Sequence, residues 1–349
     1  MGKLVLFACL IATLLHPSPA RAAQASLVPN KDNSIYQDAE NSNGVGVSLF
    51  AGNTDFNAPR RALLSFDVAG SIPGGSTITS VRLTLTCTQS PIGITTVHPF
   101  GLRALSADWG EAGSNAGNPG GMGAPAATGD ATWTQRHFGM SDPWTTAGGD
   151  FAPTVSGSAA VGSCSPAVTM TFASTSAMVA DVQGWLDNPC SNHGWILIGD
   201  EANFTTARRF ASRESTTSPK PTLVVDFTAP TTGVGAVPDG ADVPGTPLRV
   251  GKLPGGQIQL DWSDSCQPDD DYAVYEGELG QFYSHAPVVC STGGVTLAAV
   301  QPAFAAAYYL VAPTRGGFEG SYGKASNGVE RPWLCGACFP RVLSNPVCP

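Results

Sequence analysis

Apolar and polar side chains alternate with a period of two in several stretches of the first two thirds of the chain. The clearest stretches are residues 62–68, 81–87, 168–172 and 223–227. Successive side chains of a strand point to opposite faces, so each of these strands would have one apolar and one polar face. Half-buried strands at this density predict two packed antiparallel sheets, and therefore an all-β sandwich.

A helical period stands out at one place in this part, over residues 176–186. Its apolar face is formed by Met178, Val182 and Trp185. Either Ser174 or Ser176 is expected to cap the amino end, because a serine hydroxyl can accept a hydrogen bond from a free backbone N–H of the first turn. The sequence therefore predicts one helix within an otherwise β domain.

The region from Ala112 to Asp150 is rich in Gly, Ala and Pro and contains isolated aromatic residues. It predicts long, ordered loops, which in proteins either carry function or cover a sheet. Trp109, Trp133 and Trp144 lie in loop-like segments, which favours exposure, and exposed indole rings could stack on sugars. Trp185 and Trp195 are instead expected in the core.

The last hundred residues contain a second set of strand signals. The segments are Ile258–Trp262, Asp271–Gly277, Ala307–Pro313 and Glu319–Ser326. In pattern and order they resemble the tryptophan strand, the next strand, the tyrosine strand and the last strand of a fibronectin type III domain. The resemblance implies a smaller β-sandwich that acts as a spacer or partner surface, and it implies no activity.

The amino-terminal residues have the features of a secretory signal peptide. Lys3 precedes an apolar run, Leu4–Leu15, and an A-x-A cleavage motif follows at Ala20–Ala22. No later segment is long and apolar enough to cross a bilayer, so we expect a secreted or cell-surface protein without membrane insertion. Charged residues make up 13% of the chain and the net charge is −9, which disfavours nucleic acid as a partner.

The chain has nine cysteines, of which Cys9 lies in the expected signal peptide. An even number in an exported chain predicts disulfides. The disulfide candidates are Cys87, Cys164, Cys266, Cys290, Cys335, Cys338 and Cys348. We expect Cys87 to pair with Cys164 and Cys266 with Cys290. Each domain then holds an odd number, so either one bridge crosses between the domains or Cys190 and one tail cysteine stay free.

Five segments of the first domain occur together in a recognisable order. They are Arg60–Asp67, Ile78–Leu85, Gly194–Glu201, Arg208–Glu214 and Thr222–Phe227. Together they resemble the DNRLRE family, which is grouped with the family-96 carbohydrate-binding modules. The resemblance implies a β-sandwich of the jelly-roll kind on a secreted or surface protein, and a binding module rather than an enzyme.

These observations divide the chain into four parts. A signal peptide is expected over residues 1–23 and a jelly-roll domain over 24–228. A linker is expected over 229–247, because Pro and Gly dominate it and large apolar residues are almost absent. The fibronectin-like domain with its disulfides would occupy 248–349.

The resemblance also directs attention to the arginines, because some carbohydrate-binding members of that family bind acidic polysaccharide through basic residues. A guanidinium group can donate two parallel hydrogen bonds to a carboxylate. Arg209 and Arg213 are expected on one exposed strand face, opposite a buried Phe210, with Arg61 as a further contact. The structural alternative is that Arg213 and Glu214 form an ion pair that fixes the last strands.

No cofactor is expected, although oxygen-bearing side chains that could ligate a structural Ca²⁺ are present. They are Asp32, Asn33, Asp38, Asn41, Asn43, Asp200 and Glu201. The same residue types populate ordinary turns, and no fixed calcium-loop spacing is found.

Catalysis is not expected either. A glycoside hydrolase needs two carboxyl groups at a set distance, which spacing in a β fold does not reveal. The available acids are Asp108, Glu111, Asp200, Glu201 and Glu214. No histidine has a recognisable nucleophile as partner. The sequence thus predicts a non-catalytic protein that binds acidic polysaccharide or a cell-envelope glycan, or else a structural surface protein without a sugar site.

Overall fold

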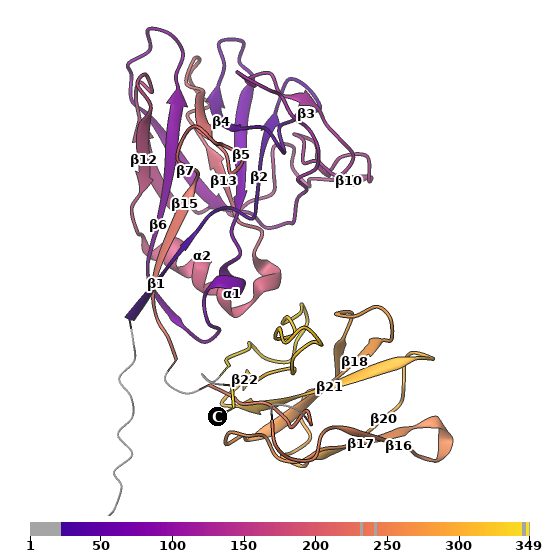
Figure 1. The fold of residues 1–349 in the computed structure, drawn as a ribbon. Coiled ribbons are helices and arrows are strands. Elements are labelled where there is room, and N and C mark those ends of the chain that lie inside the picture. The colour runs from indigo at the N-terminus through magenta and orange to yellow at the C-terminus, as the bar shows by residue number, and fades with distance from the viewer. Residues whose placement is uncertain (1–21, 231–232, 241–242, 344–346, 349) are drawn as a thin grey trace, which may run out of the picture.

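The computed structural model describes residues 22–230, 233–240, 243–343 and 347–348 (Figure 1). The fold is all-β, as predicted: its named strands pair antiparallel throughout, and the helices in the described ranges are few and short. The expected signal peptide lies outside the described residues, except for Ala22 and Ala23, which belong to the first strand.

The first sheet is built around β6, the longest strand. Its order is β1-β15-β6-β14-β4, and β12 pairs with the other edge of β6. The strands are β1 (Ala22–Leu27), β4 (Ser48–Asn53), β6 (Thr77–Gln89), β12 (Val168–Phe172), β14 (Arg208–Ala211) and β15 (Thr222–Thr228).

The second sheet lies against the first and is joined to it through the β4–β5 pairing. Its order is β2-β5-β13-β7-β11. The strands are β2 (Lys31–Tyr36), β5 (Pro59–Ser65), β7 (His98–Ala104), β11 (Gly157–Val161) and β13 (Trp195–Ile198). Short pairings add β3 (Asn41–Ser42) with β8 (Ala124–Pro125), and β9 (Gln135–His137) with β10 (Asp142–Pro143).

The main core fills the space between these two sheets. Leu83 and Leu85 of β6 meet Leu64 of β5 and Leu102 of β7, and all four side chains are fully buried. These are the apolar positions of the period-two pattern. Burying a side chain of this size contributes roughly 1.5–3 kcal/mol, so the alternation itself fixes which faces meet.

Two helices close the end of the sandwich that faces the carboxyl-terminal unit (Figure 1). They are α1 (Val68–Ser71) and α2 (Ser176–Asp187). The predicted apolar face of α2 is buried, as expected, but the prediction that Ser174 or Ser176 caps this helix is wrong. Thr175 accepts a hydrogen bond from the Met178 N–H at 3.0 Å, because the Ser174 hydroxyl instead accepts one from the Val81 N–H of β6.

The outer face of the second sheet is covered as well. Leu63 of β5 and Ile196 of β13 point away from the main core and form a second apolar cluster with Trp109, Trp133 and Trp144. These tryptophans come from the loops between β7 and β11, which lie over this face near β2 and β10 (Figure 1). The loops therefore act as a cover.

The carboxyl-terminal unit contains two smaller sheets. One has the order β16-β17-β20 and the other β19-β18-β21-β22. The strands are β16 (Arg249–Lys252), β17 (Ile258–Asp261), β18 (Asp271–Glu278), β19 (Ala286–Val289), β20 (Leu297–Val300), β21 (Ala307–Arg315) and β22 (Phe318–Glu319). Three expected strands are present, whereas the expected last strand, Glu319–Ser326, is strand only at its first residue. A single-turn helix, η2 (Pro254–Gly256), joins β16 to β17, and a similar one, η1 (Pro189–Ser191), follows α2 in the first unit.

Part of the expected linker is packed against this unit. Val234 and Ala236 are 3% exposed. The Val234 N–H donates to the Val342 carbonyl at 2.8 Å, and the Ser321 N–H donates to the Gly235 carbonyl at 2.9 Å. The small apolar residues of this stretch therefore find partners near the carboxyl terminus.

Four disulfides are present among the described cysteines. Cys87–Cys164 is confirmed. The predicted pairing of Cys266 with Cys290 is wrong. The other three disulfides are Cys190–Cys335, Cys266–Cys348 and Cys290–Cys338. Val289 pairs with Val274, so Cys290 lies alongside β18, whereas Cys266 precedes that strand and contacts Ala236. Cys190–Cys335 is the crossing bridge that the odd cysteine counts allowed.

Candidate functional site

A surface groove of about 330 Å³ lies where β14 meets two turns of the first unit. One turn, residues 90–92, follows Gln89 at the end of β6, and the other, near Pro119, belongs to the covering loops. Three arginines line the groove together: Arg60, Arg208 and Arg209. The sequence resemblance had drawn attention to Arg209, but it gave no sign that these turns would complete a groove.

Arg208 is a buried cation held by backbone carbonyls. Its side chain donates to the carbonyls of Gly162 at 2.8 Å, Thr206 at 2.9 Å and Thr96 at 3.1 Å. Burial lowers its pKa, but an arginine remains protonated at neutral pH. No carboxylate within the described part of the chain neutralises Arg208.

Arg209 is half-buried and has neutral partners. Its Nε donates to the Thr88 hydroxyl at 3.0 Å, and its Nη1 donates to the Asn118 side-chain oxygen at 2.9 Å. Burial lowers its pKa as well. Arg60, in contrast, pairs with Asp38 at 2.8 Å. Within the described residues, the groove thus has two arginine charges without a carboxylate partner.

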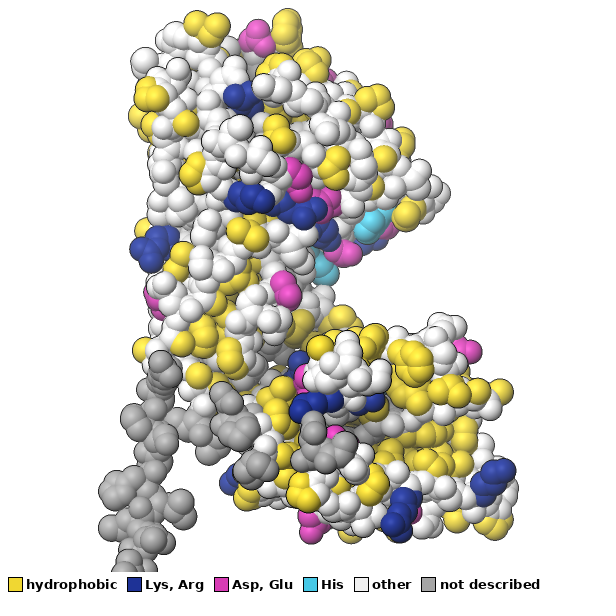
Figure 2. Space-filling view, viewed as in Figure 1, with side chains coloured by type: hydrophobic (Ala, Val, Ile, Leu, Met, Phe, Trp, Pro, Cys, Tyr) yellow, Lys and Arg dark blue, Asp and Glu magenta, His cyan; other side chains and the backbone are white. Residues whose placement is uncertain are grey.

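The other two predicted arginines are engaged with acids. Arg61 holds Glu201 through Nε and Nη2, both at 2.7 Å, and its guanidinium lies 4.7 Å from the centre of the Trp133 ring. Arg213 donates to both oxygens of Glu111 and pairs with Glu214 at 2.9 Å. The second contact is the Arg213–Glu214 ion pair predicted from the sequence as the alternative to sugar binding. Figure 2 shows Lys and Arg side chains next to Asp and Glu side chains on the same unit.

The expectation that Arg209 and Arg213 share one strand face is wrong. Strand β14 ends at Ala211, so Arg213 lies in the turn beyond it. Phe210 is fully buried, as expected. The exposure expected for the tryptophans is also wrong: Trp109, Trp133 and Trp144 are 0%, 8% and 5% exposed. They cover the apolar outer positions of the second sheet and cannot stack on a sugar as they lie.

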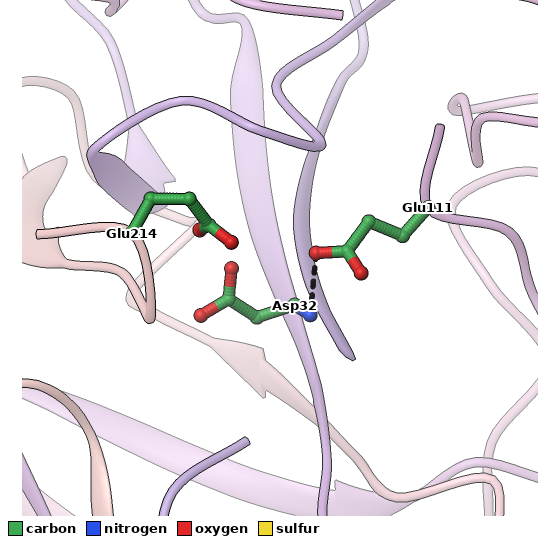
Figure 3. Close-up of side chains that lie close together, drawn as sticks. All are labelled: Asp32, Glu111 and Glu214. Atoms are coloured by element: carbon green, nitrogen blue, oxygen red, sulfur yellow. Dashed lines mark hydrogen bonds between the residues drawn. The ribbon is translucent and has the colours of Figure 1, made fainter. Parts of the chain in front are cut away.

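Asp32, Glu111 and Glu214 form a carboxylate cluster (Figure 3). Asp32 comes from β2, Glu111 from the segment after β7, and Glu214 from the turn after β14. One carboxylate oxygen from each lies within 4.8 Å of the others. The Asp32 N–H donates to Glu111 Oε1 at 3.1 Å, and the Arg213 N–H donates to Asp32 Oδ2 at 2.7 Å.

Burial dominates the electrostatics of this cluster. It raises the pKa of Asp32 well above the usual range; the Glu214 charge raises it further, and the backbone hydrogen bond from Arg213 opposes both. Burial also raises the pKa of Glu111. Burial alone would lower the pKa of Arg213, but the hydrogen bond and charge of Glu111 and the charge of Glu214 raise it.

Most of the residues that could ligate Ca²⁺ have protein partners. The Asn33 side-chain oxygen accepts hydrogen bonds from Ser34, Ser42 and Asn43. Three acids of the set are also engaged: Asp38 contacts Arg60, Asp200 contacts His98, and Glu201 contacts Arg61. The other two asparagines bond to backbone groups, Asn41 to the Met122 carbonyl and Asn43 to the Ala116 N–H. Asp32 differs, because its Oδ1 is buried without a partner.

Among the acids considered for catalysis, Glu111 and Glu214 come together. The Asp108 carboxylate instead pairs with Lys31 at 2.7 Å. Glu111 and Glu214 are both held by Arg213, beside the fully buried Asp32. Two of the histidines, His98 and His137, contact the carboxylates of Asp200 and Asp142.

Comparisons with known proteins do not identify this chain. No protein-family model matches it, and no curated protein matches it. Among solved structures it is similar to a β-1,2-glucanase from Parabacteroides distasonis, at 10% identity and a TM-score of 0.17, over 84% of this chain and 34% of that one. The chain spans about a third of that protein, and a likeness this weak carries no argument. The resemblance to the DNRLRE family stays a prediction.

In the part of the chain that the structure describes, no helix is both long and apolar enough to span a bilayer. The four disulfides are typical of a protein that folds in an oxidising compartment.

Proposed function

We propose that this is a secreted or cell-surface protein that binds acidic polysaccharide, without catalysis, in the groove at Arg209. The observation that carries the proposal is the pair of arginine charges in this groove, Arg208 and Arg209, with no carboxylate partner among the described residues. The chain as a whole has a net charge of −9, so this local positive charge stands out. A uronic acid would supply the missing carboxylate.

The groove has the parts that such a ligand needs. Arg209 donates to Thr88 and Asn118 through one nitrogen each, and its Nη2 has no hydrogen-bond partner among the described residues. A guanidinium held on two sides in this way is already oriented, which lowers the entropy lost on binding. Exposed Gln89 can donate to sugar hydroxyls, and Pro91 and Ile92 supply apolar surface.

A non-catalytic role is supported by the acids. Glu111 and Glu214, which lie close together, are tied to Arg213, and Asp32 beside them is fully buried. Neither glutamate lines the arginine groove. A substrate in the groove would therefore not meet this pair.

A structural surface protein without a sugar site is the second candidate. The pairing of Arg60, Arg61 and Arg213 with acids favours it, as does the burial of the loop tryptophans. In that case Arg208 and Arg209 would serve only to hold the turns around β14.

Affinity electrophoresis of the mature protein in alginate, pectate and neutral glucan gels separates these candidates. We expect retardation by the acidic polysaccharides that weakens with salt, because ionic screening already acts over about 8 Å at physiological ionic strength. Arg209→Ala should weaken binding at least about tenfold, since a charged hydrogen bond contributes roughly 1.5–3 kcal/mol.

Arg82→Ala is the matched control. Arg82 is an exposed arginine of the same β6 strand, seven residues before Gln89 and therefore about 23 Å from the groove. It changes the net charge equally and should leave affinity unchanged. Equal loss in both variants would indicate nonspecific charge attraction, and no retardation by any acidic polysaccharide would favour the structural role.

A further inference from the structure

Two carboxylate oxygens at the Asp32 cluster are buried and have no hydrogen-bond partner. They are Asp32 Oδ1 and Glu214 Oε2. Figure 3 shows the Asp32 and Glu214 carboxylates pointing toward one another. A buried charged oxygen without a partner is strongly unfavourable, so the site calls for a further positive group between these two atoms.

Arg213 does not supply that group. Its Nε and Nη2 donate to Glu111, its Nε also contacts Glu214 Oε1, and its backbone N–H donates to Asp32 Oδ2. All of these bonds go to oxygens other than the two free ones. With the three acids ionised, one arginine leaves the cluster with two negative charges, which equals the charge that one divalent cation would neutralise.

We propose that Asp32, Glu111 and Glu214 bind one Ca²⁺ ion, which joins β2 to the segment after β7 and to the turn after β14. One oxygen from each acid lies within 4.8 Å of the others. Two oxygens that each lie about 2.3–2.6 Å from the same Ca²⁺ can be up to about 5 Å apart, and the separations in the cluster fall within that limit. Backbone carbonyls or water complete the coordination.

The ligand chemistry selects Ca²⁺ among divalent cations. All three side chains offer carboxylate oxygen, and none offers nitrogen or sulfur, which favours a hard cation over zinc or copper. Mg²⁺ requires near-ideal octahedral geometry and gives up its water reluctantly, so a set of three protein carboxylates suits the more adaptable coordination of Ca²⁺ better. None of the three acids lines the arginine groove, so this inference is independent of the proposed function.

The test compares thermal unfolding of chelator-treated protein in EGTA and in CaCl₂, together with calorimetric titration by Ca²⁺. At a calcium concentration about a hundredfold above Kd, we expect Tm to rise by about 5–10 °C. Calorimetry should give one site per chain, and an equal concentration of Mg²⁺ should give a smaller shift. An unchanged Tm with no calorimetric heat would overturn the proposal.

Asp32→Asn and Glu214→Gln should abolish the calcium-dependent rise in Tm. The control Glu201→Gln breaks an arginine–carboxylate pair elsewhere in the same unit and should keep the rise in full. If Asp32→Asn does not fold, Glu214→Gln decides. Retention of the rise in Glu214→Gln would refute the site. An Asp32→Asn protein as stable as the wild type in EGTA, with no response of either to Ca²⁺, would show instead that the two carboxyl groups share a proton.

Discussion

Asp271, at the start of β18, shows how one side chain can organise a turn. Its Oδ1 accepts hydrogen bonds from the N–H groups of Tyr272, Thr292 and Gly294, at 2.7, 2.9 and 2.9 Å. Burial alone would raise the pKa of Asp271, but hydrogen bonds, including one from Ser291, outweigh it and lower the pKa to about 2. The ionised carboxylate therefore holds the 291–294 turn against β18.

Asp271→Asn should reduce the free energy of unfolding by about 1 kcal/mol at pH 7, a low value because the side chain is partly exposed. The folded-state pKa is below the unfolded one, so this contribution is present above about pH 4. It is lost as the pH falls through about 2. Denaturant unfolding of both proteins at pH 7 and pH 2 measures this. A constant difference at both pH values would contradict it.

Trp133 tests whether the loop tryptophans belong to the core. Trp133→Ala should lower the free energy of unfolding by about 3–5 kcal/mol, because it opens a cavity under the covering loops. The proposed affinity for acidic polysaccharide should be the same in the folded fraction as in the wild type. Denaturant unfolding and affinity electrophoresis are measured on the same samples. Lost affinity with unchanged stability would restore the sugar-stacking role.

Among the elements, α2 depends on one hydroxyl. Thr175 occupies the N-cap position and accepts from the Met178 N–H, whereas neighbouring Ser174 is used by β6. Which of the two adjacent hydroxyl residues caps the helix depends on the strand against which the helix packs. Sequence spacing alone does not reveal that contact. The helix itself was predictable, because its period of 3.6 is a local property.

Thr175→Ala should lower the free energy of unfolding by about 1 kcal/mol, through loss of the cap. Ser176→Ala, one residue further along, is the control and should change it little. Thermal unfolding followed by circular dichroism measures both. A larger loss in the serine variant would mean that the cap assignment is wrong.

The strands of the core were predictable from sequence for the same local reason, but the contacts around them were not. Ile196 carried one available signal, since β13 is apolar on both faces, and such strands are covered on both sides. The carboxylate cluster was out of reach: Asp32, Glu111 and Glu214 meet only when three distant segments fold together. The Arg209 groove likewise depends on turns far from β14 in sequence.

At the scale of the whole molecule, the two units are joined twice. The chain passes between them near residue 230, and Cys190–Cys335 provides a second covalent connection. A cavity of about 410 Å³ lies between the α1 end of the first unit and carboxyl-terminal residues that include Trp333 and Arg341. The division into two independently folding domains stays a prediction, and the bridge gives a way to test it.

Limited proteolysis between residues 228 and 247 should give two fragments that run as one species on a non-reducing gel and separate after reduction. In a Cys190→Ser/Cys335→Ser variant they should separate without reductant. The variant Cys266→Ser/Cys348→Ser, which lacks a bridge within the second unit, is the control and should keep the fragments joined. Separation of the wild-type fragments without reductant would contradict the crossing bridge.

The same bridge determines how the protein would respond to tension. Cys190 and Cys335 are 145 positions apart, which corresponds to roughly 500 Å of fully extended chain. A pulling force applied on either side of this loop passes through the sulfur–sulfur bond, so that length is shielded and cannot be drawn out while the bond lasts. The second unit would thus lengthen little under load, even where its strands come apart.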